Sequence, residues 1–240
     1  MMEFEDLSET VESLAPGSQF ELAPFVVGSP SAVNAAVIVA HPDDETLWAG
    51  GTILMHPSYR WFIVATCRKN DPDRSPKFYQ VLQNYGAMGV MADLDDSPEQ
   101  IPLRSQDVQE TILQLLPPLT FDLLLSHAPG GEYTRHRRHE EVSQAVLALW
   151  QTGQISAKEL RLFAYEDDGG RRLPQAIQAA HHYVALPDAV WQEKYRLITE
   201  IYGFSPQSWE ARTTPRSEAF WRFESEPALQ TWLDETRFIR

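Results

Sequence analysis

The sequence predicts an α/β fold with a mainly parallel β-sheet, and three observations support this prediction. Short continuous apolar runs without polar alternation recur along the chain, as expected for strands that are buried on both faces. Polar loops follow these runs, and the segments after the loops carry apolar residues at helical spacing. This alternation of strand and helix patterns is typical of a sheet whose parallel strands are joined by right-handed crossovers.

The predicted strands are short apolar runs bounded by polar or turn-forming residues. Their sequences are AAVIVA (35–40), RWFIVATC (60–67), FDLLLS (121–126), LRLFAYE (160–166) and, as a weaker candidate, HHYVAL (181–186). A polar loop (68–77) and an acidic turn (93–100) separate them from later elements. The apolar runs are of the length usual for strands of a buried sheet.

The predicted helices show apolar residues recurring at three- and four-residue intervals. We expect them at 45–55, 77–88, 105–116, around the apolar positions 142–149, and at 188–202. The first is interrupted by Gly50 and Gly51, and the third stops before the pair Pro117-Pro118.

Length and composition predict one main domain. The chain has 240 residues and a hydrophobic content of 43%, which is enough for one sizeable core. Residues 1–33 are rich in acids, Pro and Gly, and we expect an N-terminal extension that packs on a single domain comprising 34–240. That domain ends in an aromatic-rich tail with Trp209, Trp221 and Trp232, which we expect to be core or interface anchors.

Charge and cysteine content exclude several classes of function. The net charge of −14 disfavours nucleic acids and anionic membranes as partners. No apolar run approaches the roughly 18 residues of a membrane span, and the acidic N-terminus does not resemble a signal peptide, so we expect a soluble cytoplasmic protein. The single cysteine, Cys67, allows neither an internal disulfide nor a thiolate zinc cluster. Homo-oligomerisation stays open.

Reactive side chains gather after three of the predicted strands. In open α/β sheets ligands bind outside the carboxyl ends of the strands, so these side chains are expected at one edge. They are His41, Asp43 and Asp44 after the first strand, Arg68 and Lys69 after the second, and His127, Glu132, Tyr133, His136 and His139 after the third.

This pattern predicts a metal site. His41 and Asp44 lie three residues apart at a strand-to-helix turn, and either His136 or His139 could supply a third ligand. Two histidines, one carboxylate and an open position form a catalytic zinc set, and a bound cation would offset the repulsion between neighbouring acids. The alternative is that an aspartate only caps the next helix. We expect His127 to be a surface or hydrogen-bonded structural histidine. Iron, cobalt or manganese would also suit the two histidines and one carboxylate.

The stretch AHPDDETLWAGGTI (40–53) resembles the signature of the PIG-L/LmbE-like family of zinc-dependent de-N-acetylases. Three further stretches are similar to other parts of that family, so that the resemblance covers roughly residues 34–222: VATCRKNDPDRSPKFYQVLQNYGAMGV, FDLLLSHAPGGEYTRHRRHEEV and ARTTPRSEAF. It implies a Rossmann-like three-layer fold, one bound zinc ion, and removal of the acetyl group from an N-acetylglucosamine-type conjugate, a small-molecule substrate, with release of acetate and a free amine.

Carried over residue by residue, the resemblance assigns specific roles. His41, Asp44 and His139 would be metal ligands, Asp43 the general base and His136 the group that stabilises the oxyanion or protonates the leaving amine. The surrounding loops would bind substrate through Arg68, Arg74, Glu132 and Tyr133.

Two departures from the family's pattern stand out. Where the family's His-x-Asp-His motif has an Asp, this chain has Arg138. An arginine would lower the pKa of a neighbouring imidazole. Glu132, Glu140 or Glu141 could instead substitute for the missing acid. Tyr133 also lies one residue further from His136 than expected for a tyrosine that helps the oxyanion. Two alternatives therefore stay open: a hydrolase of another amide or ester, and a degenerate metal-binding member without activity.

Overall fold

A seven-stranded sheet lies at the centre of the described chain, which in this computed structural model comprises residues 32–133 and 135–236. The predicted N-terminal extension lies almost entirely outside these residues. The strands of the sheet are β1 (Asn34–Val39), β2 (Arg60–Cys67), β3 (Met88–Leu94), β4 (Leu123–Ser126), β5 (Leu160–Phe163), β8 (His182–Ala185) and β9 (Ser217–Phe223). A separate two-stranded ribbon pairs β6 (Tyr165–Glu166) with β7 (Gln175–Ala176).

The order of the strands is β3-β2-β1-β4-β5-β9-β8. The first five strands are parallel, and β9 pairs antiparallel with both β5 and β8. The sheet is therefore mainly parallel, as predicted. Because the chain builds outward from β1 to β3 and then returns to place β4 on the other side of β1, the order reverses between β1 and β4.

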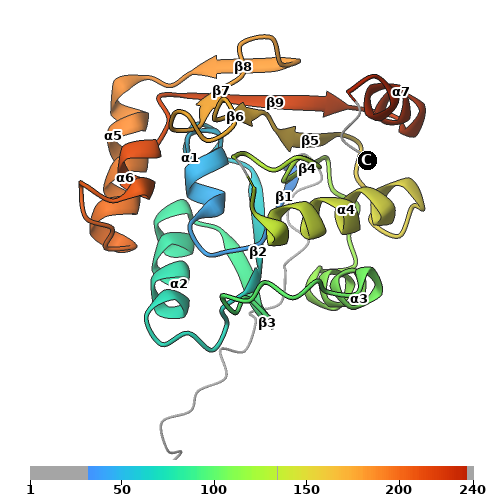
Figure 1. Cartoon of the computed structure of the whole chain (residues 1–240), viewed down its shortest axis with the longest axis horizontal. Helices are drawn as coiled ribbons and strands as arrows, with labels where there is room; N and C mark the ends of the chain where they lie inside the picture. The colour runs from blue at the N-terminus through green and yellow to red at the C-terminus, as the bar shows by residue number, and fades with distance from the viewer. Residues whose placement is uncertain (1–31, 134, 237–240) are drawn as a thin grey trace, which may run out of the picture. The chain divides into compact units, whose positions relative to one another are not determined.

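Helices cover both faces of the sheet and complete the three predicted layers (Figure 1). Their bounds are α1 (Asp44–Met55), α2 (Arg74–Tyr85), α3 (Ser105–Leu115), α4 (Arg137–Gln151), α5 (Asp188–Arg196), a π-helical turn η1 (Leu197–Ile201), α6 (Trp209–Thr213) and α7 (Glu226–Thr236). The residues Ala35, Val37 and Val39 of β1 pack with side chains of α1, α2 and η1 in one core cluster. Helices α3 and α4 lie side by side on the opposite face.

Two strands of the seven-stranded sheet, β3 and β9, escaped prediction, as did β7 of the ribbon. The expected helix at 77–88 begins at Arg74 and ends after Tyr85, because Gly86 takes a left-handed conformation with φ 63° and the chain then enters β3. We expected the segment of β9 to be part of the C-terminal tail, but it forms a strand of the sheet between β5 and β8. Its Phe220 and Phe223 are buried. Of the three tryptophans expected to be core or interface anchors, Trp232 is buried, Trp221 is half-buried and Trp209 is exposed.

A buried carboxylate fixes the middle of α1. The Glu218 carboxylate, from β9, accepts the backbone N–H groups of Gly51 and Thr52, both at 2.7 Å, the Thr52 hydroxyl at 2.6 Å and the Lys194 ammonium at 2.7 Å. A Cβ atom on Gly51 would lie 2.4 Å from the side chain of Leu186 and 3.0 Å from Glu218, so glycine lets the carboxylate approach the helix. The middle of α1 is thereby tied to β9.

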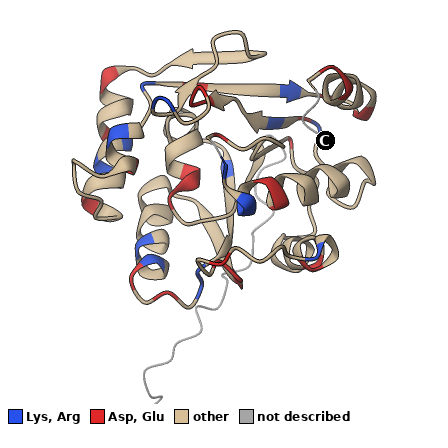
Figure 2. Ribbon diagram, in the orientation of Figure 1, with Lys and Arg blue, Asp and Glu red and all other residues tan. Residues whose placement is uncertain are grey.

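Charged residues are spread over the helices and loops, and some of them lie at the starts of α1 and α4 (Figure 2). Asp44 and Glu45 lie in the first turn of α1. The first turn of α4 contains Arg137, Arg138 and Glu140. No helix in the described ranges has the length and apolar character of a membrane span.

Candidate metal centre and catalytic pocket

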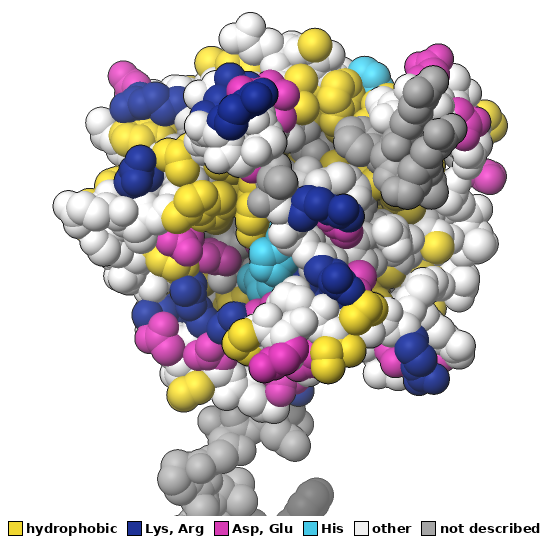
Figure 3. Space-filling model, in the orientation of Figure 1, with side chains coloured by type: hydrophobic (Ala, Val, Ile, Leu, Met, Phe, Trp, Pro, Cys, Tyr) yellow, Lys and Arg dark blue, Asp and Glu magenta, His cyan; other side chains and the backbone are white. Residues whose placement is uncertain are grey.

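The candidate site lies where the strand order reverses. β1 leads into the turn that carries His41 and Asp44, and β4 leads into the loop that ends at α4 and His139. Since β1 and β4 are parallel neighbours, their carboxyl ends deliver both segments to one point, as is usual for ligand sites in such sheets. Histidine side chains are visible at the base of a hollow on this face (Figure 3).

Three ligand atoms form a nearly equilateral triangle in this hollow. His41 Nδ1 lies 3.1 Å from Asp44 Oδ2, Asp44 Oδ2 lies 3.2 Å from His139 Nε2, and His139 Nε2 lies 3.3 Å from His41 Nδ1. Ligands at about 2.0–2.1 Å from a tetrahedral zinc ion are about 3.3 Å apart, so the three atoms have the separation that one ion requires. The predicted residues are therefore brought together in a geometry compatible with a divalent metal.

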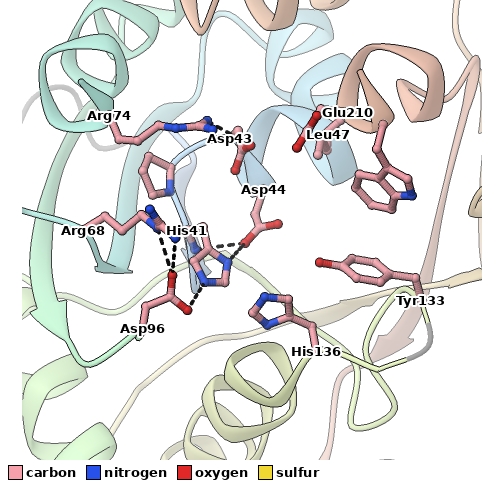
Figure 4. Close-up of a pocket in the computed structure, with 12 residues that line it drawn as sticks. His41, Asp43, Asp44, Leu47, Arg68, Arg74, Asp96, Tyr133, His136 and Glu210 are labelled. Atoms are coloured by element: carbon pink, nitrogen blue, oxygen red, sulfur yellow. Dashed lines mark hydrogen bonds and ion pairs between the residues drawn. The ribbon is translucent and has the colours of Figure 1, made fainter. Parts of the chain in front are cut away.

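Each of the two candidate ligand histidines, His41 and His139, has a carboxylate on its other ring nitrogen. Asp96 Oδ1 lies 3.1 Å from His41 Nε2, and Glu132 Oε2 lies 2.7 Å from His139 Nδ1 (Figure 4 shows the Asp96 contact). Such carboxylates fix the tautomer and the ring orientation of metal-ligating histidines. Asp96 was not predicted as a site residue, because DLDDSPEQ offers several acids and nothing local distinguishes this one.

Glu132 therefore departs from its expected place among substrate-binding residues. Its side chain is completely buried behind His139 and also accepts a hydrogen bond from His127 Nδ1 at 3.0 Å. Burial raises its pKa, but the histidines His127 and His139 outweigh that effect and lower it to about 2. A charged carboxylate at this depth orients histidines and has no surface for substrate.

His127 lies close to the ligands but is held by the backbone. Its Nε2 accepts the Ala40 N–H at 3.0 Å, which leaves Nδ1 to donate to Glu132. Burial lowers its pKa, consistent with this neutral form. Although His127 stands within metal-binding reach of Asp44 and His139, its lone pair is engaged, and the prediction of a hydrogen-bonded structural histidine agrees with this geometry.

Asp43 precedes α1 in a strained conformation, with φ 119°, which favours glycine. Glu45 Oε2 accepts the Asp43 N–H at 3.0 Å and holds the turn. The Asp43 side chain lines the pocket, where Arg74 lies 3.4 Å away. Burial raises the pKa of Asp43 well above its usual range, the charge of Asp44 adds to the effect, and Arg74 opposes it. A carboxylate of raised basicity beside the ligand triangle suits proton abstraction.

His136 faces the same pocket without a fixed partner. Its ring stacks on His139 with 4.5 Å between ring centroids and meets the edge of His41 at 4.7 Å. Its buried Nδ1 has no hydrogen-bond partner among the described residues. Burial and then the nearby charges of His139 and His41 lower its pKa to about 3, so the ring is neutral.

The Arg138 side chain has no described contact with His136, and the pKa of His136 is lowered mainly by burial and by His139 and His41. Its guanidinium is buried on the other side of α4, where it contacts the loop before α3 and Glu141. None of the acids suggested as substitutes bonds His136 within the described ranges: Glu132 binds His139, Glu140 pairs with Arg135, and Glu141 pairs with Arg138.

The pocket beside the triangle has a volume of about 410 Å³. Its lining includes the expected Arg68, Arg74 and Tyr133 together with Trp209 and Glu210. Arg68 binds Asp96 at 2.7 Å, and Tyr133 packs edge-on against Trp209 with 4.7 Å between ring centroids. Glu210 was not predicted, and Trp209, which was expected to be a core or interface anchor, lines the pocket instead. Both lie on a short helix far along the chain from the site motifs.

Comparison with solved structures identifies the fold. An N,N'-diacetylchitobiose deacetylase from Pyrococcus horikoshii is similar over 81% of this chain and 85% of its own, with a TM-score of 0.62 and 15% identity. The chain has the LmbE-like fold. A deacetylase of the teicoplanin biosynthesis pathway is similar over 81% of this chain and 99% of its own, with a TM-score of 0.59 and 14% identity.

A third LmbE-like match is a 4-carboxy-2-hydroxymuconate hydratase from Pseudomonas putida, with a TM-score of 0.53 and 17% identity over 85% of this chain and 88% of its own. These matches support the PIG-L/LmbE-like resemblance seen in the sequence. No family model and no curated protein matched the chain.

Proposed function

We propose that this protein is a divalent-metal-dependent deacetylase that hydrolyses the acetamide of an N-acetylglucosamine-type conjugate to acetate and a free amine. The observation that carries the proposal is the triangle of His41 Nδ1, Asp44 Oδ2 and His139 Nε2, with edges of 3.1 to 3.3 Å, at the base of a pocket that also holds Asp43 and His136. We further propose that zinc occupies the triangle.

Amide hydrolysis requires a nucleophile, stabilisation of an oxyanion and a proton for the departing amine. His41, Asp44 and His139 would hold a divalent ion, which when bound would lower the pKa of a water molecule and polarise the carbonyl. Asp43 takes the proton from the attacking water, since its buried carboxyl has a raised pKa and faces the pocket. Arg74, at 3.4 Å, keeps Asp43 in place and limits its protonation.

His136 acts on the other side of the reacting carbonyl. Because its Nδ1 is engaged by no described residue, the neutral ring can turn an N–H toward the oxyanion or toward the leaving nitrogen. As the C–N bond breaks, Asp43 passes to the leaving nitrogen the proton that it removed from water, and the neutral His136 ring donates a hydrogen bond without transferring a proton. The contact between the His136 and His139 rings, 4.5 Å between centroids, holds the imidazole at that position.

The pocket favours an uncharged sugar over a polyanion. Of the lining residues, Arg68 and Arg74 are both engaged by carboxylates, those of Asp96 and Asp43. Glu210 adds a further acid, and Trp209 and Tyr133 provide aromatic faces for a sugar ring. This lining supports an acetamido sugar, and it argues against a carboxylate-rich substrate of the kind named for the hydratase neighbour.

Acetate release from a panel of N-acetylglucosaminyl conjugates tests the proposal. Zinc-loaded wild type is compared with Asp43→Asn and His136→Ala, and the metal content of each is measured. Asp107→Asn, which alters an exposed acid on α3 outside the pocket, serves as the matched control. We expect release by wild type and by the control, and a loss of about 10²–10⁴-fold in the other two variants with zinc retained.

Three outcomes separate the alternatives. No release from any conjugate by zinc-loaded wild type would contradict the proposed substrate class, and hydrolysis of other amides or esters would then identify a related hydrolase. Release that persists in Asp43→Asn would contradict the assigned base. Tightly bound zinc with no turnover of any substrate would support a metal-binding protein without activity.

A further inference from the structure

Arg138 is a buried cation that fastens the loop between β3 and α3. Its side chain is 1% exposed. Its Nε donates to the carbonyl of Asp95 at 2.5 Å, its Nη2 to the carbonyl of Ile101 at 2.9 Å, and its Nη1 to Glu141 Oε2 at 2.6 Å. The other oxygen of Glu141 accepts the N–H of Leu103 at 3.0 Å. One guanidinium, with the carboxylate that it binds, therefore holds both ends of the segment 95–103.

This segment carries Asp96, the carboxylate that meets a proposed metal ligand. Asp96 Oδ1 lies 3.1 Å from His41 Nε2, and Asp96 Oδ2 accepts hydrogen bonds from Arg68. Arg68 is 42% exposed at the pocket rim and is itself a long side chain, so it fixes the loop less firmly than the buried Arg138 does. Gln100 donates to Asp96 Oδ1 at 3.0 Å from within the same segment.

We propose that Arg138 is a positioning residue: it sets the loop so that Asp96 holds the ring of His41 in its ligating orientation. The residue touches neither substrate nor ligand triangle and acts through the backbone of Asp95 and Ile101. It stands at the sequence position of an acid in the related motif but serves a different histidine, His41 instead of His136. The inference rests on the proposed function only in taking His41, Asp44 and His139 as the metal ligands.

Zinc affinity is the direct readout, because a carboxylate behind a ligand histidine typically contributes 10–100-fold to metal affinity. The dissociation constant is measured by competition with a chromophoric chelator at fixed pH. The absorption spectrum of the Co²⁺ form reports the ligand geometry independently. We expect Asp96→Asn to weaken zinc binding about 10–100-fold and Arg138→Met to weaken it about tenfold, with altered Co²⁺ spectra in both.

The decisive measurement is the double variant. If Arg138 acts through Asp96, the double variant Asp96→Asn with Arg138→Met weakens zinc binding no more than the stronger of the two single changes does. If the two act independently, the fold-changes multiply.

Two controls separate positioning from general loss of stability. Arg161→Met removes a partly buried arginine of β5 from its pair with Glu159, away from the loop. Ile112→Ala opens the core beside α3 without touching the loop contacts, and its unfolding midpoint shows how much destabilisation alone can do. Both are expected to bind zinc as wild type does.

Arg138→Lys keeps the test valid if Arg138→Met does not fold. A lysine retains the charge opposite Glu141 but cannot bridge that carboxylate and two carbonyls together. Unchanged zinc affinity in whichever variant folds, or multiplicative effects in the double variant, would overturn the role of Arg138 alone. A wild type that binds no zinc would instead overturn the proposed function and this inference with it.

Discussion

Removing the charge of Glu218 tests how the middle of α1 is held. The carboxylate and its partner Lys194 are both fully buried, and the carboxylate accepts four hydrogen bonds of 2.6 to 2.7 Å. In Glu218→Gln the amide keeps one acceptor oxygen, and its NH₂ group faces two donors. Two hydrogen bonds are therefore lost, and the Lys194 ammonium loses its counter-charge.

The expected loss of stability follows from these contacts. Breaking a buried ion pair by removing one partner costs about 3–5 kcal/mol, because the remaining charge stays desolvated. In a domain of this size each kcal/mol shifts the unfolding midpoint by about 2–4 °C, so a decrease of roughly 10 °C is expected. Replacing Lys194 as well, in Glu218→Gln with Lys194→Met, removes the stranded cation and should recover part of the loss.

Urea unfolding followed by circular dichroism and tryptophan fluorescence measures these differences. Glu159→Gln is the matched control, since this glutamate of the sheet region is partly exposed and pairs with Arg161 and Arg222. Its substitution is expected to cost less than about 1 kcal/mol. A Glu218→Gln protein within 1 kcal/mol of wild type, or a double variant that shows the full sum of both losses, would refute the reasoning.

Three further predictions concern the site and its surroundings. Asp43→Gly should abolish turnover yet raise the unfolding midpoint. The φ angle of Asp43, 119°, costs a non-glycine residue about 1–3 kcal/mol of stability, which glycine would recover. A lower midpoint would contradict stored strain at this turn. Zinc affinity should strengthen as pH rises from 6 to 9. Burial lowers the pKa of His139, but Asp44 and Glu132 raise it to about 10, so zinc must displace a proton from this histidine. A zinc affinity that calorimetry finds independent of pH would exclude this competition. Cys67 should resist Ellman's reagent at pH 8 until the protein unfolds, because burial raises its pKa to about 12; rapid reaction of the native protein would show that the thiol is accessible.

Much of the fold was determined locally by the sequence. The bounds of β2 and the end of α3 before Pro117 follow from continuous apolar runs and from proline, which act without reference to distant segments. β3 and β9 could not be predicted in this way. The Met-, Gly- and Ala-containing β3 has a weak strand pattern, and β9 owes its place to pairing with β5 about sixty residues earlier.

The sequence by itself also determined which residues could bind a metal, because His41, Asp43 and Asp44 follow a buried strand and the histidines of the second loop follow its neighbour. It left open which of those histidines completes the set by geometry, and only the tertiary structure places His139 Nε2 within 3.3 Å of the other ligand atoms. It likewise decided that Asp96 contacts His41, that Glu132 contacts His139 and that Arg138 binds the loop before α3. The physical reason is that a residue type determines what a side chain can bind, whereas distance, burial and lone-pair direction depend on segments that meet only when the sheet is formed.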